Sequence, residues 1–449
     1  MPLIWRFLNR FMRRSLSHST QNEIMSWAIG LVLISVPMPY TYSSIALAIL
    51  GAVAVMGMVQ RQVNWRRAYL WPMLLFGLIV LSLLWTEDMG KSWRGIGRQL
   101  PLLVMPLSFL FWPKFDRKVV HKGVFIGGVA GAFLALFAVA RAGLRSMEQG
   151  DYTAFFYHEL VDFWALNAIY ISAVSATYVL FFWLAYPHGK GRSWRALILG
   201  GIHMGFLILL SSKNMILTTL LIGFVAKAYT HRNRIKQLVL IVLIGLSALI
   251  ALSQTPWGSR WAQQQSTPIA DAWYCEGFTD IYPWTGATLR VFFTRVFVEQ
   301  LSHDQTWGTG YGINAGQAKI AEGQNRYFVY CGYNTYNLHN QYWQTIFELG
   351  LFGGLLLVLM LVELARAGVK RRDWFHLGFA GLMMALMLTE TYLWRQRGLI
   401  HFMVFYCALM AWVDSSRTPL NNHQISTPSK GQINPPSKGP IKSQQLDRR

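Results

Sequence analysis

Apolar residues gather in long blocks along this chain, and short polar connections separate the blocks. The hydrocarbon core of a bilayer is about 30 Å thick, so a helix needs about 20 mostly apolar residues to cross it. The pattern therefore predicts an all-α integral membrane protein with about twelve transmembrane helices. These are expected at residues 24–40, 43–59, 68–84, 100–112, 119–140, 164–186, 196–211, 214–229, 237–254, 343–363, 375–390 and 399–413.

The composition agrees with this prediction, because 53% of the 449 residues are hydrophobic and only 14% are charged. The formal net charge is +21, which in a soluble chain would suggest a nucleic-acid partner. Here the basic residues lie mostly between apolar blocks and do not interleave with aromatic residues in a soluble domain. No nucleic-acid partner is therefore expected.

Basic residues also predict the topology, since they collect in alternate connections at 61–67, 114–122, 190–195, 232–236 and 370–372. The positive-inside rule places these connections and both chain termini in the cytoplasm. The first apolar block follows a basic N-terminus and lacks the small-residue cleavage site of a signal peptide, so we expect it to remain as an anchor.

The opposite face then receives one long loop with many glycines, prolines and aromatic residues, which predicts an ordered cap rather than an unstructured linker. The end of the chain is polar and rich in Pro, Ser, Lys and Gln, which predicts disorder. The expected organisation is a basic cytoplasmic N-terminus at 1–23, nine helices at 24–254, a periplasmic loop with catalytic elements at 255–342, three helices at 343–413 and a disordered cytoplasmic tail at 414–449.

Three cysteines are too few for a disulfide-built scaffold or a cysteine-rich zinc site. Cys275 and Cys331 fall in the long outer loop, while Cys407 lies in the last predicted helix. In an oxidising compartment Cys275 and Cys331 would form a disulfide; otherwise they are two reduced thiols. The sequence leaves both alternatives open.

Cations on the outer side go against the positive-inside bias, so each needs an explanation. Guanidinium groups close to a low-dielectric surface suit the forked geometry of phosphate oxygens. The outer set comprises Arg94, Arg98, Arg141, Arg145, Lys213, Arg290, Arg295, Arg395 and Arg397.

Arg290 lies in a stretch, 287–301, with a helical pattern of apolar residues. At about 100° per residue it shares a face with Phe293 and Phe297, while Arg295 and Glu299 lie opposite and can pair at i and i+4. An arginine on an apolar face is costly without an anionic partner, which favours a ligand role. The alternative is an arginine that reaches lipid headgroups.

Two other cationic turns are candidates. Lys213 stands in a tight reversal between two predicted helices, at a helix N-terminus that attracts anions; alternatively it is a lysine that snorkels at the interface. Glu390, Arg395 and Arg397 lie in the short turn 390–398 at a membrane boundary. They either bind phosphate or form an ion-pair cluster among themselves.

His339 stands just before an apolar block that enters the membrane from the outer side. The positive end of the following helix favours a neutral imidazole, and the neutral form can accept a proton. The two interpretations are a general base and an interfacial histidine bonded to the backbone.

Several familiar motifs are absent from the outer loops, including Asp-x-Asp, His-Glu-x-x-His and any cysteine cluster, so no metal and no cofactor are expected. The glycine-rich run at 308–312 lacks the strand-to-helix context of a nucleotide loop. We therefore expect a mobile turn there.

Residues 337–342 (Asn-Leu-His-Asn-Gln-Tyr) and 347–353 (Phe-Glu-Leu-Gly-Leu-Phe-Gly) resemble the signature of the O-antigen ligase and polymerase superfamily. The arginine helix at 287–301 and the glycine-rich run at 308–312 resemble two further motifs of that family. The resemblance covers about 196–413, together with the twelve-helix plan and the long outer loop. One departure is Lys213, because relatives commonly carry arginine there, and lysine lacks the bidentate fork.

The resemblance implies transfer of a glycan from undecaprenyl diphosphate to an acceptor hydroxyl, in one inverting and metal-independent displacement. It implies that His339 is the general base and that Arg290 binds the diphosphate. Lys213, Arg395 and Arg397 are further candidates for diphosphate binding. Supporting roles are expected for Asn340, Tyr342 and Glu390.

Within the superfamily, a single dominant outer loop favours an O-antigen ligase, which joins the glycan to the lipid A core oligosaccharide in lipopolysaccharide biosynthesis. The expected location is the inner membrane of a Gram-negative bacterium, in contact with membrane lipids and with the active site facing the periplasm. The alternatives are an O-antigen polymerase and a protein O-oligosaccharyltransferase. A lipid-linked sugar flippase or anion transporter is a rival from another class, but its charges would lie midway along the helices.

Overall fold

A computed structural model describes residues 17–60, 63–186, 194–230, 267–279 and 282–412. The predicted helix at 237–254, the first part of the long loop and the predicted C-terminal tail lie outside these residues. The described part is helical and contains no β-strand. Its helices are α2 (His18–Ser35), α3 (Tyr40–Val59), α4 (Leu70–Leu81), α5 (Met89–Gln99), α6 (Pro101–Leu110), α7 (Arg117–Gln149), α8 (Tyr157–Leu160), α9 (Ala168–Leu180), α10 (Trp194–Leu209), α11 (Lys213–Thr230), α14 (Ile269–Tyr274), α15 (Gly286–His303), α16 (Gln317–Arg326), α17 (Gln341–Arg371), α18 (Trp374–Met387) and α19 (Gln396–Ala411).

Five helical segments among the described residues are long and apolar enough to cross a membrane: Tyr40–Val59, Arg67–Leu84, Arg117–Gln149, Ala168–Ala185 and Gln341–Arg371. Large apolar side chains on their outer faces are exposed, including Ile45 and Val55 of α3, each more than half exposed. Such faces suit a hydrocarbon surrounding. The chain therefore has the character of a membrane-embedded helical protein, and the count of twelve helices remains a prediction.

The predicted helix at 100–112 differs from expectation. Helix α6 has ten residues, so it is about 15 Å long, half the thickness of a bilayer core. It continues from α5 through Leu100, which has right-handed helical dihedrals, and it contains Pro106. A proline inside a helix removes one backbone hydrogen bond, which agrees with the short segment.

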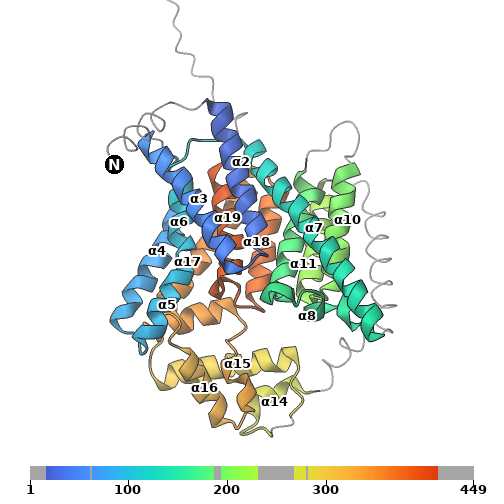
Figure 1. Ribbon diagram of the computed structural model, residues 1–449. Helices are drawn as coiled ribbons and strands as arrows, with labels where there is room; N and C mark the ends of the chain where they lie inside the picture. Colours follow the sequence, from blue (N-terminus) through green and yellow to red (C-terminus); the bar gives the residue numbers. More distant parts are fainter. Residues whose placement is uncertain (1–16, 61–62, 187–193, 231–266, 280–281, 413–449) are drawn as a thin grey trace, which may run out of the picture. The chain divides into compact units, whose positions relative to one another are not determined.

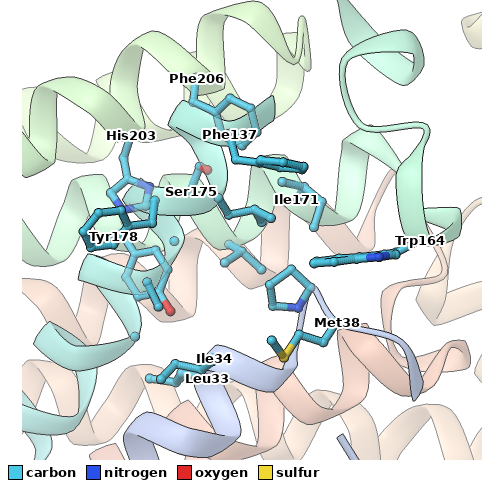
Figure 2. A pocket seen from close by; sticks show the side chains of 17 residues that line it. Leu33, Ile34, Met38, Phe137, Trp164, Ile171, Ser175, Tyr178, His203 and Phe206 are labelled. Atoms are coloured by element: carbon cyan, nitrogen blue, oxygen red, sulfur yellow. The ribbon is translucent and has the colours of Figure 1, made fainter. Parts of the chain in front are cut away.

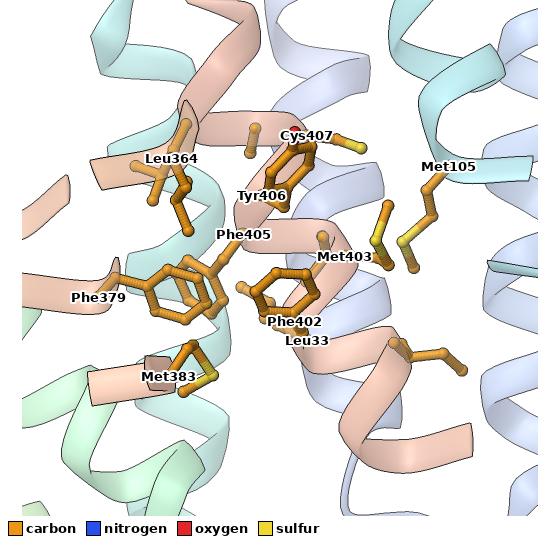
Figure 3. Close-up of a cluster of buried hydrophobic side chains, with 14 of the residues drawn as sticks. Leu33, Met105, Leu364, Phe379, Met383, Phe402, Met403, Phe405, Tyr406 and Cys407 are labelled. Atoms are coloured by element: carbon orange, nitrogen blue, oxygen red, sulfur yellow. The ribbon is translucent and has the colours of Figure 1, made fainter. Parts of the chain in front are cut away.

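Helix α19 lies at the centre of the bundle, among α2, α3, α6 and α17 (Figure 1). Residues 397–411 of this helix are all buried. A helix that is apolar on every side is stable only when other elements surround it. Figure 3 shows its aromatic and sulfur-containing side chains, such as Phe402 and Met403, packed against Phe379 of α18 and Met105 of α6.

Arginines close the C-terminal end of α19, where helix carbonyls lack partners of their own. Arg371 donates to the carbonyls of Leu409, Met410 and Trp412, and Arg66 donates to that of Ala411. These arginines come from connections that the charge pattern assigns to the same side of the membrane. Their contacts hold that end of the bundle together.

The described part of the long loop has an apolar core of its own, as expected of an ordered cap. Phe292, Phe293, Phe297 and Leu301 of α15 are buried in it. Arg295 and Glu299 form an ion pair of 2.9 Å on the opposite face. The predicted helix at 287–301 and its two faces are confirmed. Cys275 and Cys331 are free thiols in the structure.

The expectation of a mobile turn at 308–312 is wrong, because its backbone is bonded to a break in α17. Gly350 has φ 69° and ψ −177°, which interrupts the helix. The groups freed there are taken up by the turn: Tyr311 N–H donates to the Phe347 carbonyl at 3.0 Å, Gly312 N–H to Glu348 at 2.9 Å, and Leu351 N–H to Trp307 at 2.9 Å. The glycine-rich run at 308–312 and the motif at 347–353 are thus bonded to each other through their backbones.

Candidate active site

The C-terminal end of α18 is the point at which the predicted site residues meet. A helix leaves its last carbonyls without partners inside the helix. At this end, side chains from three other parts of the chain bond to them. Asn214 Nδ2 donates to Ala385 O at 2.8 Å, and Arg290 Nε donates to Thr389 O at 3.0 Å. Asn340 Nδ2 donates to Leu388 O at 3.3 Å, and Tyr342 OH donates to Met384 O at 3.2 Å.

His339 lies beside this end, with its Nδ1 atom 3.5 Å from Oε2 of Glu390. Phe293 stacks on one side of the imidazole, with ring centroids 5.8 Å apart. The side chain is 23% exposed, and neither ring nitrogen makes a hydrogen bond to a described residue. Nδ1 therefore faces a carboxylate while Nε2 is open to a ligand, which is the arrangement of a general base with an orienting acid.

The backbone of His339 is strained, with φ 46°, a left-handed conformation that non-glycine residues seldom adopt. Asn337 Oδ1 accepts from His339 N–H at 3.0 Å, and Asn340 Oδ1 caps α17 by accepting from Tyr342 and Trp343 N–H. Strain of this kind persists only where surrounding contacts impose it, and it is concentrated at functional sites.

Glu348 supports the same loop from inside α17. It is buried and accepts hydrogen bonds from Gln344 Nε2 at 3.0 Å and Trp394 Nε1 at 2.9 Å. Gln344 Oε1 in turn accepts from Leu338 N–H at 3.2 Å, next to His339. Glu348, in the motif 347–353, thus helps to position His339, in the motif 337–342.

Glu390 is 6% exposed and lies between His339 and Arg290. We expect Glu390→Gln to keep the fold, because the amide has the same shape, and to lower kcat by about tenfold to a hundredfold, as when a carboxylate that orients a histidine is removed. The negative charge that favours an Nδ1–H tautomer would be lost. Steady-state kinetics of the purified variant measures this. Glu322→Gln, at an exposed position of α16, is the control, and an unchanged kcat in Glu390→Gln would exclude the orienting role.

Arg290 donates to two carbonyls, Thr389 O through Nε at 3.0 Å and Gly286 O through Nη1 at 2.6 Å. Burial lowers the pKa of its guanidinium, and the nearby Glu390 carboxylate opposes that shift. No carboxylate of the described residues pairs with it within 4 Å. Its anionic neighbour is thus at longer range, and Nη2 remains available for a ligand oxygen.

Lys213 is the first residue of α11, directly before Asn214. Asn214 Nδ2 also donates to Thr389 Oγ1 at 2.8 Å, the residue whose carbonyl binds Arg290. The predicted turn therefore reaches the same helix end as Arg290. Its N-terminal amides and the lysine add positive charge on that side of the site.

The cations of the turn 390–398 and of the C-terminal part of α7 separate into two groups. Arg395 is exposed, and its side chain makes no hydrogen bond or ion pair to the described residues. Arg397 is buried and donates to the carbonyls of Met38, Trp164 and Ala165. Arg141 and Arg145 pair with Asp162, and Arg145 also with Glu159. These carbonyl and carboxylate contacts give Arg397, Arg141 and Arg145 structural partners that Arg395 lacks.

An apolar pocket of about 450 Å³ lies between α2, α7, α9 and α10 (Figure 2). Its walls include Leu33, Phe137 and Phe206, with Ser175, Tyr178 and His203 as polar exceptions. Trp164 lines its rim, and the Trp164 carbonyl accepts from Arg397. The pocket is thus tied to the turn 390–398 by one arginine.

Sequence reasoning missed Phe293 as the partner of His339, and the link from Glu348 to Leu338. The first had a signal in the sequence, since Phe293 lies three residues after Arg290 on one helical face. Among the described residues, no group of three or more His, Cys, Asp or Glu side chains could hold a metal ion. The chain matches no protein-family model and no curated protein.

Proposed function

We propose that the chain is an O-antigen ligase, which transfers a polysaccharide from undecaprenyl diphosphate to the lipid A core oligosaccharide at the periplasmic face of a Gram-negative inner membrane. The observation that carries the proposal is the meeting of a histidine that faces a carboxylate with a partly buried arginine at the end of α18. The first supplies a base and the second a counter-charge for a leaving anion.

The proposed step is a single displacement. His339 Nε2 takes the proton of an acceptor hydroxyl as its oxygen attacks the anomeric carbon of the donor sugar. The bond between that carbon and the diphosphate oxygen breaks, and the electron pair leaves with the diphosphate. Attack opposite to the leaving group inverts the anomeric carbon, and Glu390 stabilises the imidazolium that forms.

The leaving diphosphate carries the developing negative charge, so cations placed at its oxygens lower the barrier. Arg290 supports this role through its free Nη2 and its partly buried position, and Lys213 stands at the neighbouring helix N-terminus. Arg395 is a further cation with no described partner. A metal ion is not required for this charge balance.

The donor also has a long hydrocarbon chain. The pocket between α2, α7, α9 and α10 is apolar and connects to the turn 390–398 through Arg397. Such a pocket suits an isoprenoid segment of the lipid. In this arrangement Arg397 serves the site by shaping the pocket rim.

The test is a transfer assay with purified protein, an undecaprenyl-diphosphate-linked glycan and a lipid A core acceptor, with and without a chelator. We expect transfer that is insensitive to chelation. Arg290→Ala should lower kcat about a hundredfold and Arg290→Lys less, because lysine keeps the charge without the fork. Arg366→Ala, at an exposed position of α17, is the control.

Four outcomes of this assay would contradict the proposal. Loss of transfer on chelation would remove the metal-independent mechanism. Transfer only between two lipid-linked glycans would indicate a polymerase, and transfer only to protein hydroxyls would indicate an O-oligosaccharyltransferase. Absence of transfer to every acceptor would exclude the reaction class.

A further inference from the structure

Three tyrosines form a regular series that ends at His339. The 3₁₀ helix η8 (Cys331–Thr335) connects α16 to the His339 loop, with Tyr330 and Tyr336 as its flanking residues. In a 3₁₀ helix the side chains at i and i+3 lie one above the other. Ring centroids are accordingly 6.1 Å apart for Tyr330 and Tyr333, 5.3 Å for Tyr333 and Tyr336, and 5.7 Å for Tyr336 and His339.

The backbone of this tyrosine series is fixed by α16. Gln317 Nε2 donates to the carbonyls of Asn334 at 2.8 Å and Tyr336 at 2.9 Å. Asn334 Nδ2 donates to Asn325 Oδ1 at 3.3 Å. The rings are therefore presented on a held segment, so little conformational entropy would be lost when a ligand stacks on them.

The two ends of the series are open to solvent, while Tyr333 is half-buried against the apolar core of the loop. Tyr330 is 50% exposed and Tyr336 is 40% exposed. None of the three hydroxyls bonds to a described residue. Adjacent exposed aromatic rings beside a candidate active site are characteristic of a binding surface, whereas single exposed rings are common anywhere on a protein.

The chemistry of the segment narrows the ligand. Residues 327–340 contain no Lys, Arg, Asp or Glu, so the surface does not suit a phosphate, an acidic peptide or a basic peptide. It offers aromatic faces with phenol hydroxyls and asparagine amides. The C–H groups of a pyranose ring stack on aromatic faces, whose electron density is negative, while the sugar hydroxyls bond to the phenols and amides.

We propose that Tyr330, Tyr333 and Tyr336 bind the acceptor oligosaccharide and guide it to His339. The inference rests on the proposed function and names the subsite of that reaction which holds the acceptor. The acceptor is the occupant rather than the donor, because the series ends at the base that takes the acceptor proton. Arg290, the candidate for the donor diphosphate, bonds instead to the end of α18.

The experiment measures binding without transfer. The probe is core oligosaccharide released from lipid A by mild acid, and saturation-transfer NMR measures its affinity for the full-length protein in the absence of donor. Tyr330→Ala and Tyr336→Ala should each weaken binding about tenfold, the loss typical of one stacking ring, while Tyr330→Phe should keep most of it. Tyr152→Ala, at a tyrosine 76% exposed elsewhere, is the control.

In the transfer assay, the same alanine variants should raise KM for the acceptor and leave KM for the donor unchanged. Unchanged oligosaccharide binding in both alanine variants would overturn the proposal, as would a rise in donor KM alone. Variants that bind the glycan normally but float less with phosphatidylethanolamine–phosphatidylglycerol vesicles would also overturn the proposal. That result would indicate that the tyrosines belong to an aromatic membrane belt. Tyrosine-dependent binding in a protein that transfers nothing would support this inference and remove the proposed function.

Discussion

Replacing His339 by asparagine is expected to reduce glycan transfer by about 10² to 10⁴ in kcat, the usual contribution of a general base. The amide has a size similar to that of the imidazole but cannot accept a proton at neutral pH. Transfer is measured with purified protein and saturating lipid-linked donor. KM for donor should change little, because the diphosphate contacts come from other residues.

Asparagine is the informative replacement because of the backbone. His339 has φ 46°, and asparagine tolerates left-handed dihedrals better than most residues, whereas alanine would add strain. The variant should therefore unfold at nearly the same temperature as the wild type. His303→Asn, at a side chain 67% exposed, is the matched control. A His339→Asn protein that keeps more than about a tenth of wild-type kcat would show that another group is the base.

Gly350→Ala is expected to be the most destabilising single substitution at the site, by about 3 kcal/mol or more. The dihedrals of Gly350, φ 69° and ψ −177°, belong to a region that is nearly restricted to glycine. A Cβ atom there would lie 2.0 Å from the Gly308 carbonyl oxygen. The position of the Cβ atom and that of the carbonyl oxygen are both set by the backbone, so no side-chain rotation can relieve the contact.

The measurement is thermal unfolding of the purified variant in detergent, followed by size-exclusion chromatography. Gly310→Ala should behave similarly, because its φ is 64° and its Cβ would lie 2.5 Å from the Glu348 carbonyl carbon. Gly77→Ala in α4 is the control, since nothing lies within 4 Å of its Cβ. Wild-type stability of Gly350→Ala would mean that the helix break and its contact with the turn 308–312 are not maintained.

The effect on function follows from the same contact. The break at Gly350 lies two residues beyond Glu348, and the turn 308–312 bonds to the backbone of Glu348 itself. The hydrogen bonds of the Glu348 side chain reach the loop of His339 through Gln344. A shift of the helix at this point would move the histidine relative to Glu390. Catalytic groups must be held to within a fraction of an ångström, so stability and activity should fall together in Gly350→Ala.

The local pattern of the sequence was sufficient for several elements. The apolar blocks predicted helices because lipid leaves no other way to satisfy the backbone, and the period of α15 placed Phe293 and Phe297 on the buried face. The i, i+4 pair of Arg295 and Glu299 also follows from helical geometry alone. In each case the interacting groups are neighbours along one helix.

Only the tertiary structure decided which candidate residues bond to the end of α18 and which face other parts of the bundle. Arg290 and Asn340 bond to carbonyls 99 and 48 residues away at the end of α18, whereas Arg397 is turned toward Met38 and Trp164. No periodicity encodes these long-range contacts, because they depend on which helix ends come together when the bundle packs. The sequence by itself determined a helical membrane protein with a histidine just before a helix N-terminus. Packing determined which carboxylate and aromatic ring lie beside that histidine, and which arginine bonds to the same helix end.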